Sequence, residues 1–547
     1  MEKTILIGGE AGQGSAVTSR FIGEIFCALG YYVFNYRDYP SLIRGGHNFN
    51  VLRISDAPIF SHREKYDIII AFDQKTIDKH QKNLKKDGFI LGHKGLEADK
   101  FYPIDVQPIL GELKVPAVFG NNVLIGWLFK HFGVNEKTLL KEVEDVFGKG
   151  KKIGLIKETI KRGYDLGEKK ESLKKRKGKK YFISGSEGVG VGAINAGMDV
   201  YMAYPMTPAT PVLHFLAGKQ VEHNFLALQL ENEIGVINSA LGASFAGAKT
   251  MVGTSGGGFA LMMEGMSLAG ISEVPLVVYL AQRTGPGTGV PTYTTQGDLK
   301  FALNAGQGEF PRIVVAPGDA QEAITRTQEA FYLAYKFRNL AIVLADKHVS
   351  ESDYTFQKLD TSSVNSKRYI VDNPSEDYKS YKITKDGISP RAVPGQGPVA
   401  RATSYEHNEY GNTIEDAEWT VKMHDKRFKK EKYIRQEVEK LNPVSVYGKG
   451  KNLIVGWGST KGAILDALPD LKDFKFMQIS YLSPFPRKTV EKELKKAKRV
   501  VLVENNATGL LAEVIAEQTG HIIKEKVLKY DARPFVPDII VNKIKGK

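Results

Sequence analysis

Short apolar runs, each ending in a turn rich in glycine or proline, recur along this chain and constrain its fold more than any other feature. Clear examples are residues 66–72 (YDIIIAF) and Leu276–Ala281. Runs of this length without alternating polar residues are typical of parallel strands that helices cover on both faces. Helix-like stretches separate the runs, so the sequence predicts an α/β fold built on parallel sheets.

The chain has 547 residues, enough for three or four domains at roughly 150 residues each. We expect three α/β domains, at residues 1–168, 181–445 and 446–547. The basic run 169–180 (KKESLKKRKGKK) is predicted to be a linker, because a dense run of one charge favours a solvated segment. Residues 351–445 are richer in charge, serine and proline, and are predicted to form an irregular extension of the second domain.

Composition excludes several classes of protein. The single cysteine, Cys27, rules out a disulfide framework, a thiolate zinc site and an iron–sulfur cluster held by this chain alone. The apolar runs are too short to span a bilayer and no signal peptide is visible, so we expect a cytoplasmic protein without a membrane partner. The net charge is +14, but basic and aromatic residues do not alternate, so no nucleic acid is expected. The histidines lack metal-ligand spacing, and no metal site is predicted in the chain.

The first segment opens with a predicted strand at Thr4–Ile7, the turn Gly8–Gly14 (GGEAGQG), an apolar helix over 17–29 and a second strand at Tyr32–Tyr36. Strand, glycine turn, helix and strand are typical of a βαβ unit. Two interpretations of the turn are open: it lets helix and strand pack closely, or its backbone N–H groups face a phosphate-bearing ligand. The glycines do not have G-x-G-x-x-G spacing, which disfavours a nicotinamide dehydrogenase.

The segment Ala203–Pro211 (AYPMTPATP) follows a predicted strand, and ligands bind at the carboxyl ends of parallel strands. Pro205 and Pro208 flank Thr207 and restrict its backbone, which would hold its hydroxyl in one place, as a substrate-positioning group requires. A rigid strand-to-helix turn without a ligand is the alternative interpretation.

The segment Gln229–Ala248 is predicted to be one long helix of small and apolar residues, with Glu231 and Glu233 at its N-terminal end. The helix dipole favours a carboxylate there, so either residue can serve as a capping group. The functional alternative is a buried acid that faces the heterocycle of a cofactor.

Two glycine-rich turns follow later strands. The segment Gly253–Gly265 begins with Gly-Thr-Ser-Gly-Gly-Gly, which includes Ser255, and its glycines permit close approach of a ligand or a neighbouring chain. Arg283 comes directly after a buried strand, where it can grip a carboxylate with two hydrogen bonds. A surface ion pair is the usual alternative for Arg283, but the glycine- and proline-dense loop that follows favours a site.

Taken in order, these motifs resemble the α subunit of 2-oxoacid:ferredoxin oxidoreductases. The family's motifs stand here as Y-P-x-T-P at Tyr204–Pro208, Q-x-E-x-E with G-A-x-x-A-G within Gln229–Gly247, T-S-G-x-G at Thr254–Gly258, R-x-G-P-x-T-G-x-P-T at Arg283–Thr292, D-G-I-S-P-R at Asp386–Arg391 and E-H-x-E-x-G at Glu406–Gly411. The first segment is similar to the family's γ subunit, through G-x-x-G-Q-G at Gly9–Gly14 and R-G-G at Arg44–Gly46. The chain thus resembles a fused γ–α polypeptide with a γ-like, a thiamine-pyrimidine-binding and a transketolase C-terminal-like domain.

The resemblance implies thiamine diphosphate chemistry. Glu233 matches the glutamate that hydrogen-bonds N1′ of the cofactor's aminopyrimidine and so acts as the catalytic residue. Thr207 and Arg283 match the residues that hold the 2-oxoacid. The implied cofactor-binding positions are Tyr204, Pro205, Glu233 and Ser255. The implied candidates for the coenzyme A region are Gly12, Gly14 and Arg44.

The rest of the machinery is expected on a separate β subunit. The chain lacks the G-D-G motif with a later Asn that binds magnesium and the diphosphate, and it has too few cysteines for the iron–sulfur cluster. The chain alone is therefore expected to be inactive. With its β partner, the resemblance implies conversion of a 2-oxoacid and coenzyme A to acyl-CoA and CO2, with reduction of ferredoxin.

Two alternatives stand within this resemblance. An indolepyruvate-type (arylpyruvate) enzyme typically carries the diphosphate motif and a cysteine-rich tail in its α chain, and both are missing here. A non-catalytic γ–α scaffold is disfavoured because Thr207, Glu233 and Arg283 are present together. Tyr293 and Thr295 stand where the family often has a basic and an acidic residue, and the tyrosine favours a less charged 2-oxoacid than 2-oxoglutarate.

Overall fold

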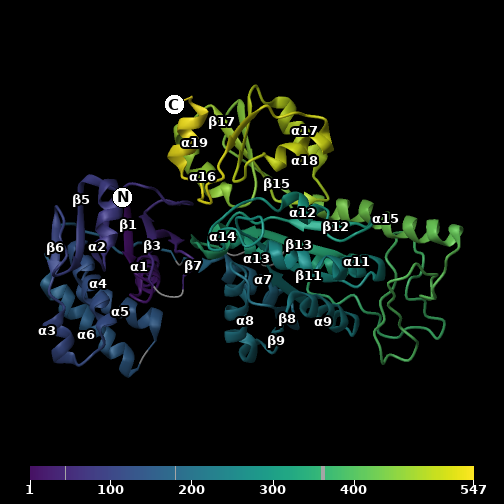
Figure 1. The fold of residues 1–547 in the computed structure, drawn as a ribbon, viewed down its shortest axis with the longest axis horizontal. Coiled ribbons are helices and arrows are strands. Elements are labelled where there is room, and N and C mark those ends of the chain that lie inside the picture. The colour runs from purple at the N-terminus through teal and green to yellow at the C-terminus, as the bar shows by residue number, and fades with distance from the viewer. Residues whose placement is uncertain (43–44, 149, 179, 359–363, 547) are drawn as a thin grey trace. The chain divides into compact units, whose positions relative to one another are not determined.

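The computed structural model describes residues 1–42, 45–148, 150–178, 180–358 and 364–546. These residues form two compact units (Figure 1). The first unit is Met1–Ile183 with Ser352–Leu359 and Val536–Asp538, and the second is Ser184–Glu351, Asp360–Phe535 and Ile539–Lys547. Neither unit is one continuous stretch of chain, because each takes in segments that are far apart in the sequence.

An eight-stranded sheet forms the centre of the first unit, in the order β6-β5-β4-β1-β3-β2-β14-β7. Its strands are β1 (Glu2–Gly9), β2 (Tyr32–Asp38), β3 (Asn48–Ser55), β4 (Tyr66–Ala71), β5 (Leu84–His93), β6 (Phe101–Ile104), β7 (Tyr181–Ser184) and β14 (Asp353–Phe356). The α-helices of this unit are α1 (Ser15–Ala28), α2 (Gln74–His80), α3 (Gln107–Leu113), α4 (Gly120–His131), α5 (Glu136–Phe147) and α6 (Lys151–Leu166).

The predicted βαβ unit at the N-terminus is present but split. β1 and β2 run in the same direction, and β3 lies between them, antiparallel to both. The connection from β2 to β3 is short, and a short connection returns the chain antiparallel to the strand it leaves. The sheet is therefore mixed, with β1, β4, β5 and β6 as its parallel part.

The basic run 169–180 has no helix or strand among its described residues, yet it packs on the first unit. The amide of Arg176 donates to the carbonyl of Leu29 at 2.8 Å. The ammonium of Lys175 forms an ion pair with the buried carboxylate of Glu142. These contacts lie inside the first unit and tie the run down, so it is not a freely solvated tether.

A seven-stranded sheet forms the centre of the second unit, in the order β18-β12-β13-β11-β10-β8-β9. Its strands are β8 (Val200–Ala203), β9 (Leu226–Gln229), β10 (Thr250–Thr254), β11 (Leu276–Gln282), β12 (Arg312–Val315), β13 (Leu340–Asp346) and β18 (Tyr481–Ser483). β18 is antiparallel to β12, and the others are parallel. One face packs on α9 (Glu233–Phe245), α10 (Gly256–Leu261), α11 (Met263–Ser272) and α12 (Leu299–Leu303), and the other on α7 (Gly185–Asn195), α8 (Thr210–His223) and α13 (Ala320–Phe337). The predicted parallel sheet covered on both faces is confirmed.

The prediction of one helix over Gln229–Ala248 is wrong at its N-terminal end. The chain first forms β9, which pairs with β8, and α9 begins only at Glu233. The side chain of Asn232 accepts a hydrogen bond from the amide of Gly235 at 2.8 Å and so caps the helix. Of the predicted helix only Gln229 lies in β9, where it pairs with Ala203 of β8, and residues 230–232 connect the strand to the helix. A helical pattern in the sequence cannot report such pairing.

The C-terminal part of the second unit holds a five-stranded sheet in the order β15-β17-β16-β19-β20. Its strands are β15 (Val444–Tyr447), β16 (Asn452–Gly456), β17 (Phe474–Ile479), β19 (Val500–Glu504) and β20 (Glu525–Leu528), and the helices of the C-terminal segment are α16 (Thr460–Ala467), α17 (Arg487–Lys496), α18 (Leu510–Thr519) and α19 (Pro537–Ile544). β15 is antiparallel and the others are parallel. The described residues thus form three sheets, a mixed one in the first unit and two mostly parallel ones in the second, and the predicted α/β class is confirmed.

The predicted irregular extension ends in a long helix that the sequence did not predict, α15 (Ala417–Glu439). Its buried side is charged: Lys426 and Lys430 donate to the carboxylate of Glu273 at the end of α11, the Nζ of Lys430 at 2.7 Å. These three side chains are no more than 3% exposed. Although burial raises the pKa of the Glu273 carboxyl, the two ammonium groups outweigh it and hold the pKa below its ordinary value.

The described residues include one buried thiol and show neither a membrane-spanning helix nor a metal-binding cluster. Cys27 is buried in α1, and burial raises the pKa of its thiol to about 12. None of the described helices is long and apolar enough to cross a membrane. Among the residues with described positions, no group of three or more His, Cys, Asp and Glu side chains is arranged to hold a metal ion.

We predict that Glu273→Ala lowers the free energy of unfolding by about 3–5 kcal/mol, because it leaves two buried ammonium groups unpaired. The loss should be largest above about pH 4.5 and should shrink as the pH falls through the lowered pKa of the folded carboxyl. Urea unfolding measures both effects. The control is Glu222→Ala, which breaks an exposed pair with Lys219 and should leave the free energy of unfolding nearly unchanged. Equal losses in the two variants would contradict the prediction.

Candidate functional site

The carboxyl edge of the seven-stranded sheet brings together the residues that the sequence singled out in the second unit. Thr207 follows β8, Ser255 follows β10 and Arg283 follows β11. Glu233 is the first residue of α9, which follows β9. Because β8, β9, β10 and β11 are parallel, their carboxyl ends lie at one edge of the sheet.

Glu233 is a buried acid rather than a capping residue. Asn232 supplies the side-chain cap of α9, Glu231 is exposed, and Glu233 is only 3% exposed. None of the described residues gives its Oε1 a hydrogen bond. The carboxylate lies against Gly258, where an added Cβ would come within 2.4 Å of Oε1. A buried oxygen without a partner is costly unless a ligand completes it, so Glu233 points to a bound polar group.

Arg283 and Thr207 are in direct contact. The Nη1 of Arg283 donates to the carbonyl oxygen of Thr207 at 2.9 Å. The Nε is buried and receives no acceptor from the described part of the chain. Burial lowers the pKa of this guanidinium from its ordinary value. The surface ion pair that the sequence left open is not present among the described residues, so an anion is the natural partner of the free N–H.

Three further polar atoms at this edge are buried without partners among the described residues. They are the hydroxyl oxygens of Ser255 and Thr292 and the Oδ2 of Asp298. The sequence does not predict Thr292 or Asp298 as site residues, although both belong to the glycine- and proline-dense loop after Arg283. Local pattern could not separate them from the loop's other polar residues, because burial of a loop residue depends on distant segments.

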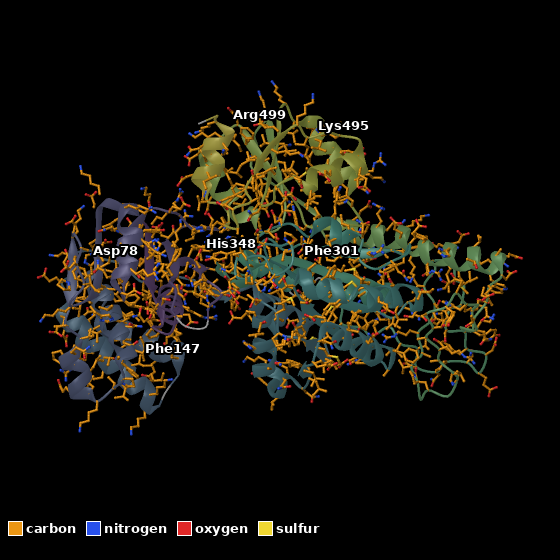
Figure 2. All side chains as sticks on the ribbon, viewed as in Figure 1. Asp78, Phe147, Phe301, His348, Lys495 and Arg499 are labelled. Atoms are coloured by element: carbon orange, nitrogen blue, oxygen red, sulfur yellow. The ribbon has the colours of Figure 1, made fainter. Side chains whose placement is uncertain are left out.

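Asp298 stands where this loop returns to the sheet. Its amide donates to Oε1 of Gln282 at 2.9 Å, while its carboxyl faces Gly256, where an added Cβ would lie 3.0 Å from Oδ2. Phe301 of α12, labelled in Figure 2, packs edge-on against Phe259 of α10 with 5.1 Å between ring centroids. Burial raises the pKa of the Asp298 carboxyl to about 6.

The two other predicted cofactor positions form the open rim of this edge. Tyr204 is 39% exposed and Pro205 is half-buried. Ile234 and Leu261, next to Glu233 and at the end of α10, are each 51% exposed. Apolar residues gathered on an exposed rim are typical of a surface that another molecule covers.

In the first unit, the glycine turn is open to a ligand. Gly12 and Gly14 have φ of 95° and 87°, so the turn needs glycine, and the space that a Cβ at Gly12 would occupy is empty to 4 Å. The turn is held from within: Oε1 of Gln13 accepts from the amide of Glu10 at 2.7 Å. α1 starts after Gly14 without a side-chain cap. Arg44 lies outside the described residues.

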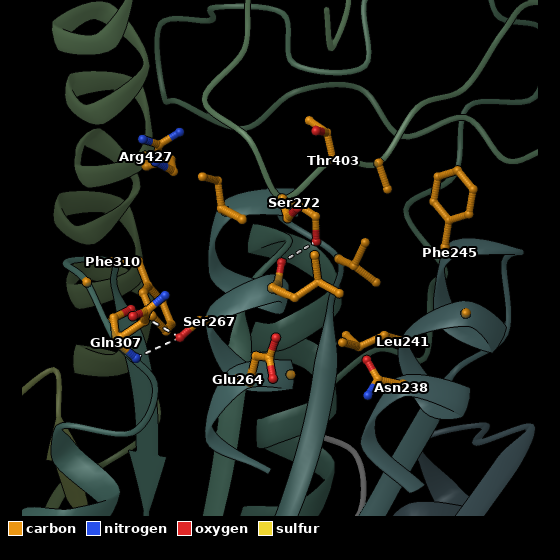
Figure 3. A pocket seen from close by; sticks show the side chains of 18 of the residues that line it. Asn238, Leu241, Phe245, Glu264, Ser267, Ser272, Gln307, Phe310, Thr403 and Arg427 are labelled. Carbon is orange, nitrogen blue, oxygen red and sulfur yellow. Dashed lines mark hydrogen bonds between the residues drawn. The ribbon is translucent and has the colours of Figure 1, made fainter. Parts of the chain in front are cut away.

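A cavity of about 840 Å³ lies elsewhere in the second unit (Figure 3). It is bounded by α9, α11, α15 and residues 402–404, with Leu241, Phe245 and Phe310 on its wall. In Figure 3 Ser267 faces Gln307 across one side, and its hydroxyl accepts from that residue's amide at 2.6 Å. None of the predicted site residues lines this cavity, so it is separate from the candidate site.

At the carboxyl edge of this parallel sheet, Glu233 Oε1 and Arg283 Nε are buried without partners among the described residues, an arrangement typical of proteins that bind a polar cofactor and an anionic substrate. Residues 191–426 match the family model "Pyruvate flavodoxin/ferredoxin oxidoreductase, thiamine diP-bdg", and residues 4–166 match "Pyruvate ferredoxin/flavodoxin oxidoreductase". The chain therefore carries this family's thiamine diphosphate-binding domain and a second domain of the same family.

Proteins that resemble most or all of the chain belong to the same family. The chain is 32% identical to the 2-oxoacid:ferredoxin oxidoreductase subunit alpha of Saccharolobus solfataricus, over 99% of this chain and 97% of that one. It is 31% identical to the 2-oxoglutarate synthase subunit KorA of Archaeoglobus fulgidus, over 67% of this chain and 98% of that one. A solved 2-oxoglutarate:ferredoxin oxidoreductase from Magnetococcus marinus superposes with a TM-score of 0.89 at 30% identity, covering 100% of this chain and 99% of that one. The chain belongs to the 2-oxoacid:ferredoxin oxidoreductase family, as an α subunit.

We predict that Asp298→Asn stabilises the second unit increasingly as the pH rises. The folded pKa of about 6 lies above the ordinary 3.8, so the folded state favours the protonated carboxyl and loses stability as the pH rises through this window. The advantage of the variant should grow by about 1 kcal/mol between about pH 5 and pH 7. Urea midpoints measure it, with the exposed Asp473→Asn as control. A gap that does not change with pH would contradict the burial of the Asp298 carboxyl.

Proposed function

We propose that this chain is the catalytic γ–α subunit of an oxidoreductase that converts a 2-oxoacid and coenzyme A to acyl-CoA and CO2 and passes the electrons to ferredoxin. The single observation that carries the proposal is the edge where Glu233 Oε1, Ser255 Oγ and Arg283 Nε are buried without partners among the described residues. In a member of this family, such an edge suits a cofactor with polar ring atoms and an anionic substrate.

The residues present fit the pyrimidine end of thiamine diphosphate. The Oε1 of Glu233 has no partner in the part of the chain that the structure describes, and the absence of a side chain at Gly258 leaves the carboxylate room. Glu233 would hold the proton shared with N1′ of the aminopyrimidine, with Tyr204, Pro205 and Ser255 around it. When bound, thiamine diphosphate supplies the electron sink that decarboxylation of a 2-oxoacid requires.

Arg283 and Thr207 would orient the 2-oxoacid. Because Nη1 of Arg283 is already bonded to the carbonyl of Thr207, the guanidinium is fixed before the substrate arrives. Its buried Nε–H would then donate to the substrate carboxylate, and the Thr207 hydroxyl would hold the adjacent carbonyl. Such preorganisation lowers the entropic cost of reaching the reactive geometry.

The remaining parts of the reaction extend beyond the second unit. We assign coenzyme A to the glycine turn of the first unit, with Gly12, Gly14 and Arg44 as its candidate contacts, since exposed amides at a helix start suit a phosphate. The Magnetococcus marinus enzyme was solved with 2-oxoglutarate, coenzyme A and succinyl-CoA bound. Magnesium, the diphosphate-binding motif and the iron–sulfur cluster are assigned to a separate β subunit, which would cover the exposed Ile234 and Leu261. We assign the enzyme to the cytoplasm.

The proposal is tested by anaerobic, coenzyme A-dependent reduction of a viologen dye with and without the co-expressed β partner. Pyruvate, 2-oxoglutarate, branched-chain and aryl 2-oxoacids are compared. Glu233→Gln should lower kcat by at least about 1,000-fold, because the amide cannot hold the same proton, and should leave β association intact. Glu231→Gln, at the neighbouring exposed carboxylate, is the control and should keep its activity. Near-normal turnover by Glu233→Gln would reject this residue and make Glu231 the candidate.

Arg283→Ala should raise KM for the 2-oxoacid by about 100-fold, since one charge-assisted hydrogen bond and its orientation are lost. The KM for coenzyme A should stay within about 2-fold, because the assigned coenzyme site is in the other unit. Steady-state kinetics of the complex measure both constants. An equal rise in both would show that Arg283 acts on the fold rather than on the acid.

A further inference from the structure

Hydrogen bonds of Gln282 hold the two ends of the loop that carries Arg283. This loop, residues 283–298, follows β11 and ends at Asp298, directly before α12. The Oε1 of Gln282 accepts from the amide of Asp298 at 2.9 Å, and its Nε2 donates to the carbonyl of Ala345 in β13 at 3.1 Å. One side chain therefore joins the two ends of the loop to the sheet. These bonds fix the two ends of the loop but not the residues between them.

The second half of the loop, residues 291–298, is also hydrogen-bonded where β13 meets α14 (Lys347–Glu351). The hydroxyl of Thr294 donates to Oδ1 of Asp346 at 3.1 Å and accepts from the amide of His348 at 3.3 Å. His348 is labelled in Figure 2. The carbonyl of Thr294 also accepts from the hydroxyl of Thr284 at 3.0 Å, which holds the two halves of the loop together.

Gln296 forms a third set of hydrogen bonds, which connect the loop to the C-terminal part of the unit. Its amide donates to the carbonyl of Asn505 at 2.8 Å, and its Oε1 accepts from the Asn505 amide at 2.8 Å. Its Nε2 donates to the carbonyl of Trp457 at 2.8 Å. The side chain of Asn506 donates to the carbonyl of Gln296 at 2.9 Å. All four residues are buried, with Gln296 and Trp457 at 0% exposure.

These contacts use every polar group of Gln296, backbone and side chain. Buried polar groups of this kind specify one position of residues 291–298, because any shift of this segment leaves several hydrogen-bonding groups unsatisfied. The segment includes Thr292, whose buried hydroxyl has no partner among the described residues, and Asp298. The loop tip at 285–290 is exposed, so the hydrogen bonds of Gln296 limit how far the substrate-facing residues can move.

We propose that Gln296 is a positioning residue for the 2-oxoacid. By bonding the loop to Asn505 and Trp457, it holds Arg283 and Thr292 where the acid binds, and so makes the C-terminal sheet part of the substrate site. The proposal rests on the function proposed above. It assigns to the C-terminal part of this chain a role in substrate affinity rather than in packing alone.

The test uses the complex of the chain with its β partner. Gln296→Met keeps the length of the side chain but removes its hydrogen bonds to Asn505 and Trp457. We expect KM for the 2-oxoacid to rise by about 10-fold or more while KM for coenzyme A stays within about 2-fold. Hydrogen–deuterium exchange over residues 284–298 should accelerate by about 10-fold, a readout of the loop that does not depend on turnover.

Gln478→Met is the matched control. Gln478 is also at 0% exposure and also joins the C-terminal sheet to the rest of the unit, through Nε2 to Oε2 of Glu322 at 2.7 Å, but it is not on the loop. It should lose similar thermal stability without a change in KM or in exchange over 284–298. If the complex of Gln296→Met does not form, Thr295→Val tests the proposal instead. It removes only the 3.1 Å hydrogen bond to the Asn505 carbonyl and should raise KM for the 2-oxoacid by about 3-fold.

The outcomes separate the two proposals. Equal KM values and equal exchange in the Gln296 and Gln478 variants would overturn the positioning role while leaving the enzyme's function in place. Faster exchange with an unchanged KM would also overturn it, because the loop would move without consequence for the acid. A wild-type complex that carries cofactor and cluster yet reduces no dye with any 2-oxoacid would overturn the proposed function itself.

Discussion

A parallel sheet that is buried on both faces can present polar side chains to a ligand only at its ends, and the second unit is organised by that constraint. β10, β11 and β13 are buried along their whole lengths. Helices cover both faces, so a polar group in the middle of a strand must find its partner inside the protein, as the hydroxyl of Tyr279 does 2.7 Å from Ser350 Oγ. The candidate site residues therefore follow the strands, and atoms of Glu233, Ser255 and Arg283 that have no partner among the described residues lie at one edge.

Close approach at that edge depends on missing side chains as much as on those present. The start of α10 presents Gly256 and Gly258 to two carboxyl groups, those of Asp298 and Glu233. Any Cβ at Gly258 would come within 2.2 Å of Thr254 Oγ1 and 2.4 Å of Glu233 Oε1. The glycine-rich turn thus makes the space in which buried acids can meet a ligand.

Buried polar contacts join the outlying segments of the second unit to its sheet. Glu273 binds two lysines of α15, and Lys461 of α16 binds Glu322 of α13 at 2.6 Å. β18, from the C-terminal segment, completes the edge of the seven-stranded sheet beside β12. The C-terminal sheet is therefore built into the unit that holds the candidate site, and the contacts of Gln296 with Asn505 and Trp457 connect it to the loop after Arg283.

The sequence by itself determined the α/β class, most of the strands and the family, and it predicted Thr207, Glu233 and Arg283 as site residues. Apolar runs report burial directly, and motifs of fixed spacing report a strand end and the turn that follows it. The tertiary structure alone decided that β3 splits the first βαβ unit, that the helix predicted from Gln229 begins only at Glu233, that α15 buries Lys426 and Lys430, and that Gln296 and the Oδ2 of Asp298 are buried in the loop after Arg283. Each of these features depends on a partner far away along the chain, such as β8 for β9, Glu273 for α15 and Asn505 for Gln296. Local pattern records what a segment can bury, whereas strand pairing and the neutralisation of buried charge are settled between segments.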